Sequence, residues 1–186
     1  EEERQVEEIM GLGEPTLVDK YIEILLRGMA SVSTEEEQER PKGIIKLLMT
    51  GLAEGAGVEK VVRLLERMHT IKKESEETAG MAGMASAVSV VIQEVSNKEL
   101  VGRAVRSLAP MKSTDVIDDD RLKSVLRLLS LLGPDCIPHV LEDLAVVPNP
   151  MFRANIAALV ARMGPHLTDL YREKLVGDSN IVPELL

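Results

Sequence analysis

Apolar residues recur along most of this chain with the period of an α-helix. In the first such segment they stand at i, i+4, i+5, i+8, i+9 and i+12 from Leu17, which places them on one stripe of a helix over about 16–32. No stretch of four or more residues shows the strict alternation typical of an exposed strand. The pattern therefore predicts an all-α fold.

The second segment begins with a helix start signal and contains a helix-breaking residue. Thr34 followed three residues later by Glu37 has the spacing of a capping box, in which side chains bond to backbone amides of the first turn. Pro41 lies inside the same apolar pattern, and proline removes an amide and clashes with the preceding turn. We expect a kink or a break at Pro41.

The same periodicity predicts the remaining helices over about 58–73, 76–96, 97–109, 120–132 and 134–146. The fourth helix, over 76–96, is rich in Gly, Ala and Met, and small residues let a neighbouring helix approach closely. The polar stretch between Pro110 and the next helix predicts a long loop. We therefore divide the chain into a charged tail (1–13), irregular helical pairs (14–110) and regular repeats (119–186).

A Gly-Pro pair occurs twice, at Gly133-Pro134 and at Gly164-Pro165, 31 residues apart. Glycine supplies a left-handed helix stop and proline suits the first position of the next helix, so each pair predicts a corner. A shift of 31 residues places apolar on apolar: Val125 on Ile156, Leu128 on Leu159, Leu129 on Val160, Leu132 on Met163, Val140 on Tyr171 and Leu144 on Leu175. A helix pair of this length cannot bury its own apolar faces, so successive pairs are expected to stack.

At "LLGPDCIPHVLEDL", with Pro138 in its second helix, the chain resembles the short HEAT-like repeats named after phycobilisome lyases. The resemblance covers 119–186 clearly and 14–110 weakly. It implies a right-handed α-solenoid of antiparallel helix pairs and, by family habit, a non-enzymatic interaction scaffold or regulatory module. The basic residue that such repeats carry before the first helix is matched out of register, by Arg121 and Arg153.

A third copy of the repeat begins at Asn180, which aligns with Asn149 of the copy before it. The sequence given ends before this copy could form a helix of two turns. We expect a fragment of a longer solenoid, whose carboxyl-terminal repeat face is exposed and allows self-association.

Composition excludes several functional classes. The net charge of −9 and the absence of a Lys/Arg-rich run argue against nucleic acid as a partner. The longest weakly polar run, residues 81–92, is shorter than the roughly 20 residues that span a bilayer. A single cysteine suits a reducing compartment, so we predict a cytoplasmic protein without membrane segments.

Candidate catalytic and metal-binding residues are few. Cys136 and His139 form a C-x-x-H pair, but His69 and His166 bring no further ligands at a useful spacing, so we predict structural roles and no metal or cofactor. The aspartates within 115–120 lack the glycine and distal glutamate of a calcium loop. We therefore predict no catalytic residue. A lyase or chaperone-like module acting on a cofactor-bearing protein stays open as an alternative, because bilin lyases share this repeat spacing.

The candidate binding surface lies opposite the apolar stripes of the repeat helices. Lys123 and Arg127 lie there on the first repeat, and Arg162 lies beside small alanines on the second. Cations beside small residues predict a shallow groove for an acidic or phosphorylated segment of another protein. The alternative is an ordinary solvated helix face.

Overall fold

The computed structural model describes residues 15–32, 34–53, 57–109 and 119–164, and every regular element in these ranges is helical. The α-helices are α2 (Pro15–Ser31), α3 (Glu35–Leu52), α4 (Val58–Glu77), α5 (Ala82–Val95), α6 (Lys98–Arg106), α7 (Asp119–Leu132), α8 (Ile137–Asp143) and α9 (Pro150–Met163). The all-α prediction is confirmed for these residues. The charged tail over 1–13, the loop aspartates before 119, His166 and the third repeat copy lie outside them.

The start of α3 follows the predicted capping pattern. The Thr34 hydroxyl oxygen accepts a hydrogen bond from the Glu37 amide (3.4 Å) and donates one to the Glu37 carboxylate (2.7 Å). Of the kink or break predicted at Pro41, the break is wrong, because α3 continues through this residue, and the kink stays a prediction. Proline there removes one amide, which would bond to the Glu37 carbonyl, and Glu37 is exposed to water.

The boundary between the third and fourth predicted helices is also corrected. α4 extends to Glu77, and a turn containing Gly80 at φ +89° separates it from α5. The polar end of α4 stays helical because its side chains point to solvent, apart from Ser75. The predicted close approach of the Gly- and Ala-rich helix is confirmed at Gly83, where a Cβ would lie 3.1 Å from the carbonyl oxygen of Ala30 in α2.

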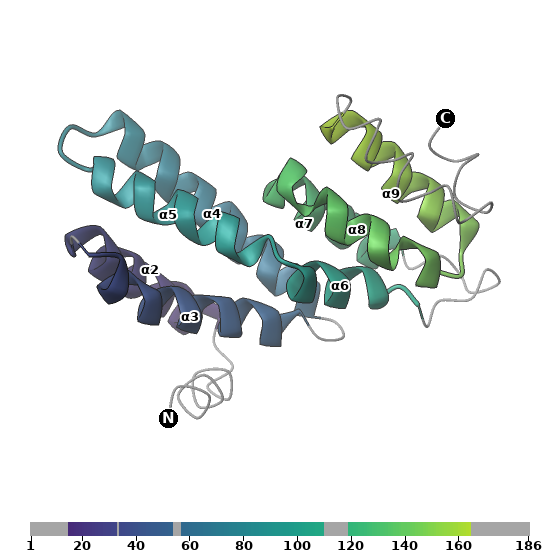
Figure 1. The fold of residues 1–186 in the computed structure, drawn as a ribbon, viewed down its shortest axis with the longest axis horizontal. Coiled ribbons are helices and arrows are strands. Elements are labelled where there is room, and N and C mark those ends of the chain that lie inside the picture. Colours follow the sequence, from purple (N-terminus) through teal and green to yellow (C-terminus); the bar gives the residue numbers. More distant parts are fainter. Residues whose placement is uncertain (1–14, 33, 54–56, 110–118, 165–186) are drawn as a thin grey trace.

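Helices that are distant in sequence pack in succession (Figure 1). α2 contacts α4, α4 contacts α7 and α7 contacts α9, while α3 contacts α6 and α6 contacts α8. α5 packs against α2, α3 and α4 and leads directly into α6. These contacts are consistent with one row of α2, α4, α7 and α9 and a second row of α3, α5–α6 and α8.

One continuous apolar core runs between the rows and draws on every described α-helix. Residues that the 31-residue shift aligns have similar burial wherever both members of a pair are described. Val125 and Ile156, Leu128 and Leu159, and Leu129 and Val160 are all buried, while Leu132 is buried and Met163 partly buried. The overlays of Val140 and Leu144 fall on residues outside the described part.

The first Gly-Pro pair forms the predicted corner. Gly133 has φ +78° and ψ −168°, and the chain bends by 110° between residues 120–132 and 134–146. The returning segment is not the single helix predicted over 134–146: a 3₁₀ turn (Pro134–Cys136) precedes α8 and another (Leu144–Val146) follows it. Pro138 has no amide to bond to the Pro134 carbonyl, which instead accepts from the Ile137 amide. Gly164 does not repeat the positive φ; its φ is −134°.

The contact between α6 and α8 is close because α6 has a glycine at its centre. Arg106 donates to Asp143 (2.8 Å), and Lys98 pairs with Glu142 (2.8 Å). A Cβ at Gly102 would lie 2.5 Å from the second carboxylate oxygen of Asp143 and 2.8 Å from the guanidinium of Arg106. Gly102 therefore makes room for the ion pair that joins the two helices.

Replacing Gly102 by alanine is expected to destabilise the protein by about 1 kcal/mol, because the crowding exceeds the gain in helix propensity. Urea unfolding of the variant measures this loss. The paired variant carries Asp143→Ala as well, which removes the crowded carboxylate. In a protein that already carries Asp143→Ala, adding Gly102→Ala should not lower the free energy of unfolding. The same loss as in the unchanged protein would show that Asp143 is not the residue that crowds the new side chain.

Candidate functional site

Two of the three predicted site residues lie one helical turn apart on α7. Lys123 and Arg127 are both exposed. Lys123 lies 3.5 Å from the Asp120 carboxylate in the first turn of the same helix. Arg127 donates from Nε to the Glu66 carboxylate of α4 at 2.9 Å. Arg127 is therefore held in place by a neighbouring helix, and sequence reasoning missed its partner because the two residues are 61 positions apart.

The third predicted residue, Arg162, lies in the last turn of α9, where a cation interacts favourably with the helix dipole. α9 packs beside α7 (Figure 1). A shift of 31 residues aligns Arg162 of α9 with Leu131 of α7. Leu131 lies eight residues after Lys123, a distance of about 12 Å along the axis of α7. The three cations therefore lie on two packed helices, Lys123 and Arg127 on α7 and Arg162 in the last turn of α9.

Ion pairs continue along the same row of helices toward α2. Glu23 of α2 accepts from Arg27 (2.7 Å) and lies 3.8 Å from Arg67 of α4. Burial raises the pKa of Asp19, and the positive charges of Arg67 and Arg63 oppose this shift. Acidic and basic side chains therefore alternate on α2 and α4. The i, i+4 spacing of Glu23 and Arg27 is a sequence signal for one such pair, but the pairs between helices carry none.

The two out-of-register arginines share a structural role. Arg121 donates to the Ser107 carbonyl (3.4 Å), and Arg153 donates to the carbonyls of Val147 (2.9 Å) and Pro148 (3.2 Å). In each case the arginine near the start of a repeat helix bonds to backbone that precedes this helix. Arg121 thus ties the start of α7 to the end of α6, 14 positions earlier, whereas Arg153 ties the start of α9 to backbone 6 positions earlier.

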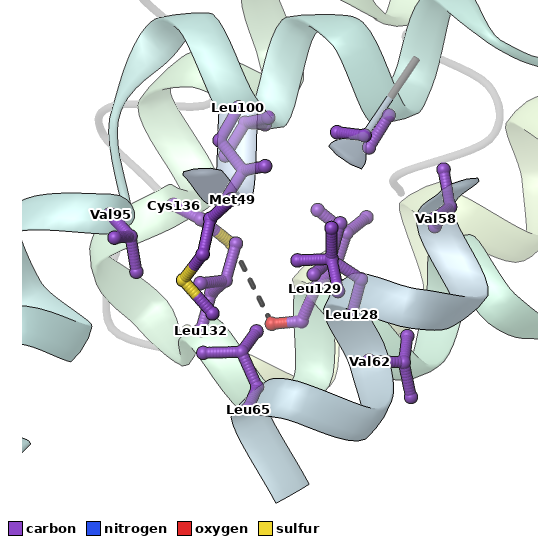
Figure 2. Close-up of a cluster of buried hydrophobic side chains, with 14 of the residues drawn as sticks. Met49, Val58, Val62, Leu65, Val95, Leu100, Leu128, Leu129, Leu132 and Cys136 are labelled. Carbon is purple, nitrogen blue, oxygen red and sulfur yellow. Dashed lines mark hydrogen bonds between the residues drawn. The ribbon is translucent and has the colours of Figure 1, made fainter. Parts of the chain in front are cut away.

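The side chains of His69, Ser96 and Cys136 lie beside the last backbone carbonyls of α7. The helix stops at Gly133, so its last carbonyls lose their partners within the helix. The Leu131 carbonyl lies 2.9 Å from Nε2 of His69, and the Leu132 carbonyl lies 3.4 Å from the Ser96 hydroxyl, which donates its proton to the Ile92 carbonyl at 2.7 Å. The Leu129 carbonyl accepts from the Gly133 amide (3.1 Å) and also from the Cys136 thiol at 3.7 Å, a bond drawn in Figure 2 among the buried side chains of several helices. Three side chains from three parts of the chain therefore contact the end of α7, just before the turn at Gly133.

The environment of Cys136 makes it a poor nucleophile. Cys136 is fully buried, and burial raises the pKa of its thiol from 9.0 to about 12, so the thiol stays protonated at neutral pH. Nδ1 of His139 is buried and has no hydrogen-bond partner in the structure. Within the described ranges no group of three or more His, Cys, Asp or Glu side chains is placed to hold a metal ion.

None of the described helices is by itself long and apolar enough to cross a membrane; the segments Asp120–Leu132 and Pro134–Val146 reach that length and composition only when counted together across their bend. A scan against protein-family models matches no family, and searches of curated proteins and of solved structures return no similar protein. The resemblance to HEAT-like repeats therefore stays a prediction from the sequence.

Proposed function

We propose that this chain is a non-enzymatic protein-interaction scaffold, built as a right-handed HEAT-like α-solenoid that holds an acidic segment of another protein. The 31-residue repeat and the two rows of successively packed helices support the architecture. The surface of α7 and α9 that carries Lys123, Arg127 and Arg162 is the proposed binding surface.

The distribution of charge carries the proposal. The whole chain has a net charge of −9, yet α7 and α9 together contain five Lys or Arg residues and two acidic residues. Both acids, Asp119 and Asp120, lie in the first turn of α7, where the helix dipole favours them. Asp120 and Glu66 partly neutralise Lys123 and Arg127, and the positive charge that remains on this pair of helices would attract carboxylates or phosphates.

The geometry favours an extended ligand over a compact one. If α9 stacks on α7 in the 31-residue register, Arg162 lies roughly 12 Å beyond Lys123 along the helix direction, and Arg127 on the first of the two helices is oriented by Glu66. An acidic segment that crosses α7 and α9 can place successive carboxylates on these cations. Since the side chains are exposed, we expect weak binding that decreases as salt is added.

The test replaces Lys123 and Arg162 together by glutamate and leaves the Arg127–Glu66 pair intact. Binding of a fluorescein-labelled decaglutamate peptide, measured by anisotropy at low salt, should weaken roughly ten-fold because two attractive charges become repulsive. The melting temperature should fall only slightly, since neither residue is buried and the losses are limited to the Lys123–Asp120 pair and the cation at the end of α9.

The matched control makes the same change in net charge on α4, with Lys60→Glu and Lys73→Glu, both at exposed positions. It should bind the peptide almost as well as the unchanged protein. Equal weakening in both double variants would show a general effect of net charge and would refute a site on α7 and α9.

A further inference from the structure

Arg127 is an exposed cation whose guanidinium is held at one of its three nitrogens. Its Nε donates to the Glu66 carboxylate of α4 at 2.9 Å, and its side chain is still 56 % exposed. Within the described part of the chain, this is the one bond that the structure shows for the guanidinium. The two terminal nitrogens, Nη1 and Nη2, are therefore left as a planar pair of donors. Such a pair matches two oxygens of one carboxylate or phosphate.

Glu66 has two opposite effects on an anion that binds Arg127. Its negative charge cancels part of the attraction. Its oxygen also restrains the arginine side chain, which then loses less conformational entropy when an anion binds. The two effects can be separated by experiment, because a neutral side chain can keep the oxygen without the charge.

Lys123 lies one helical turn before Arg127 on the same face of α7, and its side chain is 64 % exposed. Side chains at i and i+4 have Cβ atoms roughly 6 Å apart, so both cations can reach one anion. An ammonium group carries three donors, so Lys123 can contact Asp120 at 3.5 Å and an anion at the same time. Asp120 itself lies about 10 Å from Arg127 along the axis of α7.

The number of oxygens and the charge distinguish the two kinds of anion. A carboxylate uses both of its oxygens in a bidentate contact with Nη1 and Nη2, and it carries a single charge. A phosphate monoester offers a third oxygen, which can accept from Lys123, and carries a charge of about −1.5 to −2 at neutral pH. Two cations one turn apart therefore favour the phosphate over the carboxylate.

We propose that Arg127 and Lys123 bind a phosphorylated serine or threonine side chain, and that Glu66 is the residue that positions the guanidinium. The inference rests on the proposed function, because it places this side chain within the acidic segment held by α7 and α9. Since Glu66 belongs to α4, the packing of α4 against α7 sets the orientation of the site.

The test compares two fluorescein-labelled peptides by anisotropy: decaglutamate, and the same peptide with one central glutamate replaced by phosphoserine. The phosphopeptide should bind the unchanged protein roughly five-fold more tightly. Arg127→Lys is the matched control, because it keeps the positive charge beside Glu66 and removes the pair of terminal nitrogens. In this variant the preference should fall to roughly two-fold or less, the part that comes from charge alone.

Equal affinities of the two peptides for the unchanged protein would overturn the proposal. The same preference in the unchanged protein and in Arg127→Lys would also overturn it, because charge would then account for the whole effect.

Two variants of Glu66 test its positioning role at equal net charge. Glu66→Gln keeps an oxygen that can accept from Nε of Arg127, whereas Glu66→Ala removes it. The phosphopeptide should bind the glutamine variant roughly three-fold more tightly than the alanine variant. Urea unfolding should show that both variants are folded, since Glu66 is partly exposed. Equal affinities of the two folded variants would refute a positioning role for Glu66.

The same peptides separate this inference from the proposed function. Suppose that decaglutamate binds and that Lys123→Glu with Arg162→Glu weakens its binding. Absence of a preference for phosphoserine would then refute the phosphate site alone. If neither peptide binds the unchanged protein, the phosphate site and the proposed function are both refuted.

Discussion

Replacing Gly133 by alanine is expected to destabilise the protein by about 1–3 kcal/mol, because the backbone there has φ +78° and ψ −168°. Residues with a side chain rarely adopt this conformation. A Cβ at Gly133 would meet no atom within 4 Å, so the cost comes from the backbone and not from crowding. Urea unfolding at neutral pH measures the loss.

Gly28 and Gly43 provide the controls for this prediction. A Cβ at either position also meets no atom within 4 Å, but both residues lie inside helices, in α2 and α3. Alanine should therefore stabilise the protein by roughly 0.5–1 kcal/mol at each of them. A neutral or stabilising effect of Gly133→Ala would contradict the corner geometry described for this residue.

Alkaline pH is expected to destabilise the protein through Cys136. The pKa of its thiol is raised from 9.0 to about 12 in the folded chain by burial. Below pH 9 the thiol is protonated in the folded and unfolded states alike, and its contribution to stability is fully present. Between pH 9 and 12 the unfolded chain loses the proton first, so stability falls as pH rises. At pH 10.5 the expected loss is roughly 2 kcal/mol.

The measurement compares urea unfolding at pH 8 and pH 10.5, in the presence of a reductant, for the unchanged protein and for Cys136→Ala. The alanine variant loses some stability at both pH values because a buried side chain is shortened. Lysines and tyrosines titrate in both proteins, so the difference between the two isolates the thiol. The same pH dependence in both proteins would show that Cys136 is not held in a buried, protonated state.

The helical class and the repeat positions could be predicted from local pattern. The stripes of Leu128, Leu129 and their counterparts 31 residues later are buried as expected, because burial of a helix face depends on a periodicity that is written in consecutive residues. Boundaries were less predictable. α4 ends at Glu77 because the next residue, Thr78, is extended (φ −106°, ψ 120°), and α3 continues through Pro41, where the carbonyl that loses its partner belongs to the exposed residue Glu37.

The candidate site was predictable as a set of residues but not as an arrangement. Lys123, Arg127 and Arg162 lie on helix surfaces, as the sequence indicated. The pairing of Arg127 with Glu66 depends on how α7 packs against α4, and no pattern in the sequence specifies it. Because of this pairing the test changes Lys123 and Arg162 and leaves Arg127 in place. A glutamate at position 127 would lie next to Glu66, and the repulsion between the two carboxylates would disturb the packing of α7 on α4.

By itself, the sequence determined which residues form helices, which faces of them are apolar and where the chain turns at Gly133, because these properties arise from contacts between near neighbours in the chain. Only the tertiary structure decided that His69, Ser96 and Cys136 meet at the end of α7, and that Gly102 leaves space for Asp143. These contacts join residues far apart in sequence, and their free energy depends on helix packing that no local pattern encodes.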